Sequence, residues 1–186
     1  MSYDLRNVFY LGNLQEYPDS IIATGESVQP IDVSAYVDPI SKGRAKGQGL
    51  AVYRVHFNAS TTAGAPCLAA ETAAFTVGLS VKPYTTTGDG ITGVISYGDL
   101  SPSSDLLIYG QEFIGQASGP GATQLRPAFC SPSKEVPYVV VRDTIFQTMH
   151  ASVVFQADVL TSFRMECAMI SLDTATLNQL LRTQTA

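Results

Sequence analysis

The chain has 186 residues, of which 45% are hydrophobic and only 15% are charged, and its formal net charge is −5. This composition excludes the weakly hydrophobic, highly charged class of disordered chains, and the length suits one domain with a sizeable core. The acidic balance, with no cluster of Lys and Arg at either end, argues against a nucleic-acid-binding surface, because contact with phosphates requires clustered cations.

The first 19 residues predict an arm that precedes the folded domain. They carry a short apolar anchor at 8–11, which includes Phe9, and they end close to Pro18. Asp4 precedes the apolar patch where a secretory signal would carry a basic region, so no targeting segment is expected. We expect residues 1–19 to form an N-terminal arm that docks on neighbouring molecules and residues 20–186 to form a single β domain.

The next part of the chain predicts three strands and one exposed loop. The strands are expected at 20–24, 31–37 and 50–58. The loop before the third strand, 41–49, is rich in Gly and should be solvated and mobile. Its cations are Lys42, Arg44 and Lys46. The alternative for these cations is a contact with an acidic neighbour or an anionic lipid headgroup.

The clearest strand pattern lies at 72–82. Its apolar positions are Phe75, Val77, Leu79 and Val81, and they alternate with Thr76, Gly78, Ser80 and Lys82. Alternate side chains of a strand point to opposite faces of the sheet. The pattern therefore predicts a half-buried strand with one apolar face and one solvated face. A turn is expected after it at 85–90, where glycines allow positive φ angles.

The remainder of the chain predicts more strands and one helix. Strands are expected at 91–97, 106–109, 111–114, 137–141, 144–150, 152–159 and 162–172. A long surface loop is expected at 115–124. The helix is predicted over 175–182, with Asp173 or Thr174 as its N-cap. It carries Leu177, Leu180 and Leu181 on one face.

These elements predict an all-β fold. Eight to ten short strands separated by turns, with no alternation of strands and long helices, are typical of a single antiparallel β-sandwich or jelly-roll barrel. One short C-terminal helix completes the fold. The sequence leaves the strand order open.

The search for catalytic, cofactor or metal-binding residues gives no site. With only His56 and His150, neither a catalytic triad nor a three-histidine metal centre is readily assembled. Ser96 lies in a segment that resembles a nucleophile elbow but has one residue too many before the serine. The acidic residues without diagnostic spacing are Asp99, Asp105, Glu112 and Asp143. We therefore expect no enzyme activity and no cofactor.

Two further motifs have ordinary interpretations. Cys67, Cys130 and Cys167 are odd in number and form no CxxC pair, so we expect small buried hydrophobic residues, with one disulfide left open. Asn58 begins an acceptor pattern for N-glycosylation, which matters only in a glycosylating compartment.

In size, acidity and strand pattern over its whole length, the chain resembles the smaller single-jelly-roll major capsid proteins of tailless icosahedral viruses with an internal membrane. The resemblance is closest to viruses of halophilic archaea, because Asp outnumbers Glu ten to six and Arg outnumbers Lys seven to four. No signature motif carries it. The resemblance implies a virion protein that stands upright on the capsid and forms capsomers with a second, larger capsid protein.

The resemblance also implies that function lies in the interfaces. We expect self-association, contact with an internal membrane vesicle or its proteins, and no direct contact with nucleic acid. The arm near Phe9 and the leucine face of the C-terminal helix are the expected contact segments. Tyr36, Tyr84, Tyr97 and Tyr109 are candidate contact residues, because Tyr is enriched at interfaces, although partly buried core tyrosines are equally consistent with the sequence.

Two other classes remain. A phage decoration or fibre domain, or a carbohydrate-binding sandwich, would show clustered exposed aromatic residues on one sheet face. An esterase-like or glycosidase-like enzyme would show a deep pocket with two carboxylates, or a serine within reach of His56 or His150.

Overall fold

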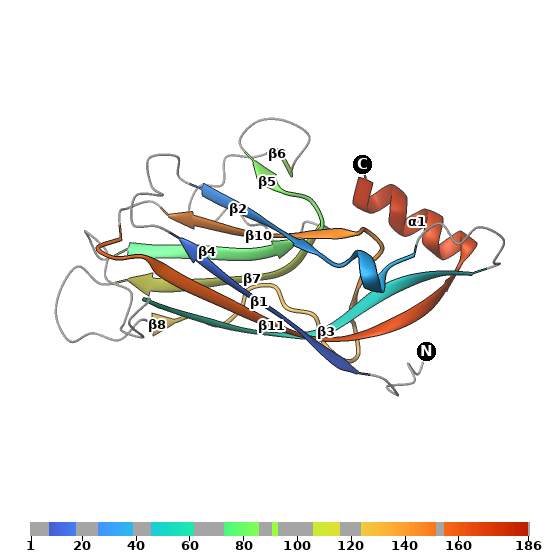
Figure 1. Ribbon diagram of the computed structural model, residues 1–186, viewed down its shortest axis with the longest axis horizontal. Helices are drawn as coiled ribbons and strands as arrows, with labels where there is room; N and C mark the ends of the chain where they lie inside the picture. The colour runs from blue at the N-terminus through green and yellow to red at the C-terminus, as the bar shows by residue number, and fades with distance from the viewer. Residues whose placement is uncertain are drawn as a thin grey trace.

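The protein is a sandwich of two antiparallel sheets with one helix at its C-terminal end (Figure 1). The computed structural model describes residues 8–17, 26–38, 46–61, 73–85, 91–92, 106–115, 124–151 and 155–185. This architecture confirms the predicted all-β fold with a short C-terminal helix.

Eight strands of three or more residues build the two sheets. They are β1 (Phe9–Tyr17), β2 (Glu26–Asp32), β3 (Lys46–Thr61), β4 (Ala73–Ser80), β7 (Leu107–Gly115), β9 (Tyr138–Val140), β10 (Thr144–Ala151) and β11 (Val159–Asp173). The two-residue strands are β5 (Tyr84–Thr85), β6 (Ile91–Thr92) and β8 (Gln124–Leu125). The helices are the short 3-10 turn η2 (Ser34–Tyr36) and α1 (Thr174–Thr185). No helix in the described ranges is long and apolar enough to cross a membrane.

The strand order, which the sequence left open, is nested. One sheet has the order β1-β11-β3-β9 and the other has the order β2-β10-β4-β7-β8. Among the eight longer strands, the first therefore pairs with the last, the second with the seventh, the third with the sixth and the fourth with the fifth. Successive pairs alternate between the sheets.

The core fills the space between the two sheets and is rich in aromatic rings. Phe75 of β4 stacks on Phe113 of β7, with 5.2 Å between the ring centroids. From the facing sheet, Phe163 of β11 lies 5.0 Å from Phe57 of β3 and meets Tyr109 of β7 edge-on at 5.7 Å. Each such ring pair adds about 0.5–1.5 kcal/mol beyond the area that it buries. The aromatic cluster therefore joins the two sheets.

Strand β4 confirms the alternation but corrects its interpretation. Phe75, Val77 and Leu79 are fully buried in the core, as predicted. Thr76 and Ser80, on the opposite face, are buried as well, so the expected solvated face does not exist. Small polar side chains at alternate positions therefore mark a covered outer face here.

Strand β1 corrects the predicted lead-in. Phe9–Tyr17 pairs with β11 over all nine residues instead of forming an irregular arm, and the predicted boundary between residues 19 and 20 lies outside the described residues. The alternation was hidden because two inward positions, Asn13 and Gln15, are polar, whereas Leu14 points outward.

The strand predicted at 31–37 is placed too far along the chain, because β2 extends over Glu26–Asp32. β2 stops at Asp32, whose Oδ1 accepts a hydrogen bond from the backbone N–H of Ser34 (2.8 Å), and η2 follows. Such a side-chain bond offers the backbone a local turn instead of a ladder. The predicted strand at 20–24 and the loop cations Lys42 and Arg44 lie outside the described residues.

Two predictions in the second half of the chain need correction. The strands expected at 106–109 and 111–114 are one continuous strand, β7, in which Gly110 makes room for the ring of Phe129. A Cβ on Gly110 would lie 2.3 Å from that ring. Of the strand expected at 152–159, residues 152–154 lie outside the described residues, 155–158 form no strand, and β11 begins only at Val159.

The C-terminal helix is confirmed. α1 extends over Thr174–Thr185, and Asp173 is its N-cap, since its carboxylate accepts hydrogen bonds from the backbone N–H and the hydroxyl of Thr176 (2.8 and 3.0 Å). These bonds lower the pKa of Asp173. Leu177 is buried against Val141 and Leu172 at the end of the four-stranded sheet.

Candidate functional site

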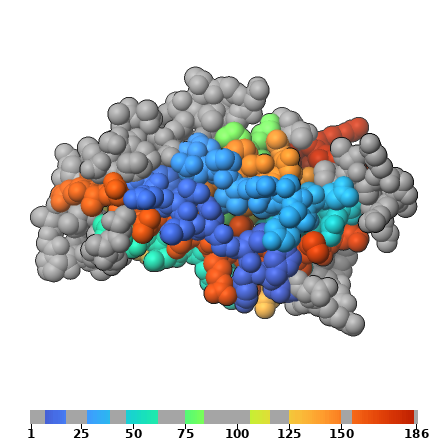
Figure 2. Space-filling model, viewed as in Figure 1, coloured from blue at the N-terminus to red at the C-terminus, as the bar shows by residue number. Residues whose placement is uncertain are grey.

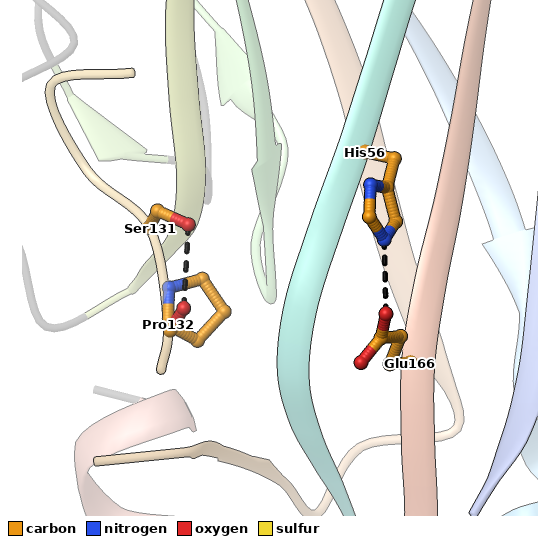
Figure 3. Close-up of polar contacts among 4 residues, drawn as sticks. All are labelled: His56, Ser131, Pro132 and Glu166. Carbon is orange, nitrogen blue, oxygen red and sulfur yellow. Dashed lines mark hydrogen bonds and ion pairs between the residues drawn. The ribbon is translucent and has the colours of Figure 1, made fainter. Parts of the chain in front are cut away.

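Of the two candidate histidines, His56 is the one whose side chain is described and has an ionisable partner. It lies on the outer face of the four-stranded sheet. Its Nε2 lies 3.0 Å from Oε1 of Glu166, and the two side chains come from the neighbouring strands β3 and β11 (Figure 3). The hydrogen bond from His56 lowers the pKa of Glu166. Half of the His56 side chain is exposed, so this is a surface pair of the kind that contributes about 1 kcal/mol or less.

No serine is shown bonded to this pair. Figure 3 also draws Ser131, whose hydroxyl donates to the carbonyl oxygen of its neighbour Pro132 (3.3 Å). His150 lies in β10, in the other sheet, opposite Glu26 and Thr76, and its side chain is not described. Ser96 lies outside the described residues.

The predicted acidic residues do not come together in the described parts of the chain. Glu112 forms an ion pair with Arg126, with 2.8 Å between Oε2 and Nη1. Asp143 lies in an exposed turn before β10, and Asp99 and Asp105 are outside the described residues. Within the ranges that the structure describes, no group of three or more His, Cys, Asp or Glu side chains could hold a metal ion.

The described cysteines are free. Cys167 is fully buried in the core and its pKa is raised to about 12 by burial, whereas Cys130 is half-buried. Cys167 matches the predicted small buried hydrophobic residue, whereas Cys130 does so only in part. Cys67 lies outside the described residues, so the disulfide that the sequence left open is tested only for the other two.

The candidate contact tyrosines divide into two groups. Tyr109 is a core residue, 3% exposed, and burial raises its pKa to about 12, so it cannot reach a partner. Tyr36 is half-buried because its ring stacks on Phe9, with 5.0 Å between the centroids. Tyr84 lies in β5, where no side chain is described, and Tyr97 is outside the described residues. Of the four candidates, only Tyr36 and Tyr109 have described side chains, and neither of these side chains is fully exposed.

Remaining candidates lie on β3. Asn58 is exposed on the outer face of this central strand, opposite Ser162 of β11. Lys46 begins β3, where its backbone is opposite Asp173. The glycosylation and headgroup-contact interpretations of these residues stay predictions.

The outer end of the four-stranded sheet at β9 is closed by the C-terminal helix. Gln184, only 2% exposed, accepts a hydrogen bond from the backbone N–H of Val141 (3.1 Å) and donates one to the carbonyl oxygen of Val139 (2.6 Å). Its side-chain amide thus takes the place of a neighbouring strand. The Arg142 guanidinium adds a hydrogen bond to the backbone carbonyl of Gln184 (3.0 Å). Much of the helix surface expected to bind neighbours is therefore used inside the chain.

The opposite end of the same sheet is β1, and here the surface is apolar. Tyr10 and Leu14 are 55% and 62% exposed on the outward face, and Val8 is exposed just before the strand. The guanidinium of Arg164 lies over the Tyr10 ring, 3.9 Å from its centroid, which is a cation–π contact. β11 is the one strand paired with β1 in the described structure.

A buried polar cluster anchors β1 to both sheets. Asn13 donates to Oε1 of Gln147 in β10 (2.9 Å), and Gln147 donates to Oγ1 of Thr161 in β11 (2.5 Å). Gln147 and Thr161 are fully buried. These hydrogen bonds are internal, so the cluster fixes β1 in the sandwich. Sequence reasoning missed it because no local signal pairs Asn13 with Gln147, which lies 134 residues further along the chain.

Comparison with known proteins does not assign this chain to a family. No known protein family matches this sequence, and no curated protein matches it either.

Proposed function

We propose that this protein is a jelly-roll structural subunit that assembles into the shell of an icosahedral virion. The observation that carries the proposal is the nested pairing of the eight longer strands, first with eighth through fourth with fifth, distributed alternately over two sheets. Folding one long eight-stranded hairpin over on itself produces this order, which is the arrangement of a jelly roll with two Greek keys. Viral capsid domains are among the proteins built in this way.

The sheet edges support an assembly role. A subunit of a shell must associate at chosen places and avoid pairing at others, because exposed strand edges bind other strands indiscriminately. In this chain the β9 edge is closed by Gln184, whereas the β1 edge carries exposed apolar side chains. An apolar edge of this kind would provide the burial that stabilises contacts between subunits.

The proposal extends to the partners that the resemblance implies. The subunit would stand upright in capsomers with a larger capsid protein, around an internal membrane vesicle. The described surface does not favour the alternative of a sugar-binding face. Tyr10 is the one aromatic residue among the exposed large hydrophobic side chains of the described chain, and Arg164 already lies over its ring.

The test is the mass of the purified native protein, measured by light scattering from low to multimolar salt, alone and co-expressed with the genes that neighbour its own. Symmetric capsomers or closed shells, visible by electron microscopy, would support the proposal. A monomer in every condition and with every co-expressed partner would overturn it.

A further inference from the structure

The four edges of the sandwich differ in how they could accept another strand. β9 is capped by Gln184 of α1. β2 carries Pro30, which has no N–H to donate, and β8 is only two residues long. Proline, a short strand and a covering helix are the devices by which proteins protect sheet edges from unwanted pairing. The outermost strands β9, β2 and β8 therefore each carry such a device, and β9 itself covers β3 only over Leu50–Val52.

β1 has none of these devices. It is nine residues long, contains no Pro, has Glu16 near its end as its one charged residue, and pairs with β11 without a register shift. Figure 2 shows β1, in the darkest blue, on the face turned to the viewer. A long, regular edge strand with exposed apolar side chains is a template for another strand. Natural proteins protect such an edge from pairing unless another strand is meant to bind there.

We propose that β1 pairs with β1 of a second copy of this chain, antiparallel and about a two-fold axis at Asn13. The inference rests on the proposed assembly function and names one of its contacts. In an edge strand only alternate residues turn their backbone N–H and C=O groups outward, so a strand pairs with its own copy only where a residue faces the equivalent residue. The axis at Asn13 is the arrangement that uses all nine residues of Phe9–Tyr17.

The side chains match across this axis. On the outward face, Tyr10 lies opposite Glu16 of the second copy, and Gly12 lies opposite Leu14 of the second copy. Leucine thus meets a position without a side chain. Glu16 faces Tyr10, and the guanidinium of Arg164 already lies over the Tyr10 ring, 3.9 Å from its centroid. Opposite charges and aromatic contacts across strands are stabilising.

The first experiment places like charges at the axis. In the variant G12K/L14K, each new lysine would face the other one across the two copies, which is destabilising. A Cβ at position 12 would come no nearer than 3.8 Å to another group, the carbonyl oxygen of Phe163, and Leu14 is exposed, so the fold is expected to tolerate both changes. The control, N58K, adds a lysine to the same face of the same sheet, on β3 and away from β1. We expect the association constant of G12K/L14K to fall on the order of tenfold or more, and that of N58K to stay unchanged.

The second experiment tests the register. Residues directly opposite in an antiparallel pair have Cα atoms about 4.5–5.5 Å apart, within the range that a disulfide spans, whereas diagonal neighbours lie about 7–8 Å apart. Co-expression of G12C and L14C chains with different tags should therefore give a disulfide-linked pair under oxidising conditions. Either variant alone should give little, because its cysteine faces Leu14 or Gly12 of the second copy.

The outcomes separate the two proposals. If the unmodified protein forms capsomers or shells, but G12K/L14K assembles like N58K and no mixed disulfide forms, the β1 inference is overturned and the assembly function stands. If the protein forms only dimers that G12K/L14K dissociates and the cysteines trap, the β1 contact is supported and the shell function is overturned. A protein that is monomeric in every condition overturns both.

Discussion

The two ends of the four-stranded sheet show opposite solutions to the same physical problem. At β9 the side-chain amide of Gln184 bonds to the carbonyl oxygen of Val139 and, just past the strand, to the N–H of Val141, and the leucine face of α1 packs beside them. At β1 no described strand follows, and Tyr10 and Leu14 stay exposed. In the proposed assembly, the open edge at β1 is the one through which subunits would pair, and the covered end at β9 is not.

The largest expected effect comes from loosening the helix that closes β9. Leu177 is buried against Val141 and Leu172, so L177A should lower the free energy of unfolding by about 2–3 kcal/mol, near the lower end of the range for buried leucines. Urea unfolding measures this, with the exposed N178A on the same helix as the control. Equal stability of the two variants would mean that α1 is not held by this contact.

A smaller effect is expected when the helix stays but its amide is removed. Q184L would leave the N–H of Val141 and the carbonyl of Val139 without their partner, which costs about 1–3 kcal/mol for buried groups. The uncapped β9 edge should also promote association at high concentration. The matched control is Q179L, at an exposed position of the same helix. If Q184L and Q179L unfold at the same urea concentration, Gln184 does not close the edge.

The β2 edge offers a test in the opposite direction. P30V restores an N–H donor on a strand edge, where Pro30 is exposed opposite Phe146. We expect the free energy of unfolding to change by no more than about 1 kcal/mol, while a new self-association appears in sedimentation velocity. N58V, which adds the same side chain on β3 without adding an N–H donor, is the control. Identical sedimentation of the two variants would show that Pro30 does not protect this edge.

The smallest effect concerns the start of α1. Hydrogen bonds from Thr176 lower the pKa of Asp173 in the folded protein. A depressed folded-state pKa stabilises the fold above the unfolded-state value, and this contribution is lost as pH falls through the folded-state pKa. The stability advantage of the native protein over D173N should therefore shrink between about pH 5 and pH 2. Thermal unfolding across this range measures it. A difference that does not change with pH would exclude the carboxylate cap.

Local patterns in the sequence predict part of this architecture well. The alternation in β4 and the leucines behind Asp173 identify a strand and a helix, because each pattern lies within one element. β1 escaped detection because its inward residues Asn13 and Gln15 are polar, and their reason for facing inward is a partner such as Gln147, 134 residues away from Asn13. Long-range partners of this kind leave no local trace.

The candidate site was harder to predict than the fold. Tyr109 was a reasonable contact residue by composition, yet its neighbours in the core decide its burial. Whether an edge is open depends on which strand is outermost in its sheet and, at β9, on Gln184, which lies 45 residues further along the chain than Val139. Strand order is set by pairings between distant segments, so no single stretch of sequence contains it.

The most direct test of this account is hydrogen exchange of the backbone amides of β1 and β9, measured at the concentration where the protein assembles and compared with G12K/L14K. We predict that the outward amides of β1 are protected in the assembled protein and lose that protection in the variant. The amide of Val141 should stay protected by Gln184 in both. Equal protection of β1 in the assembled protein and the variant would contradict the claim that β1 is the edge through which the subunits join.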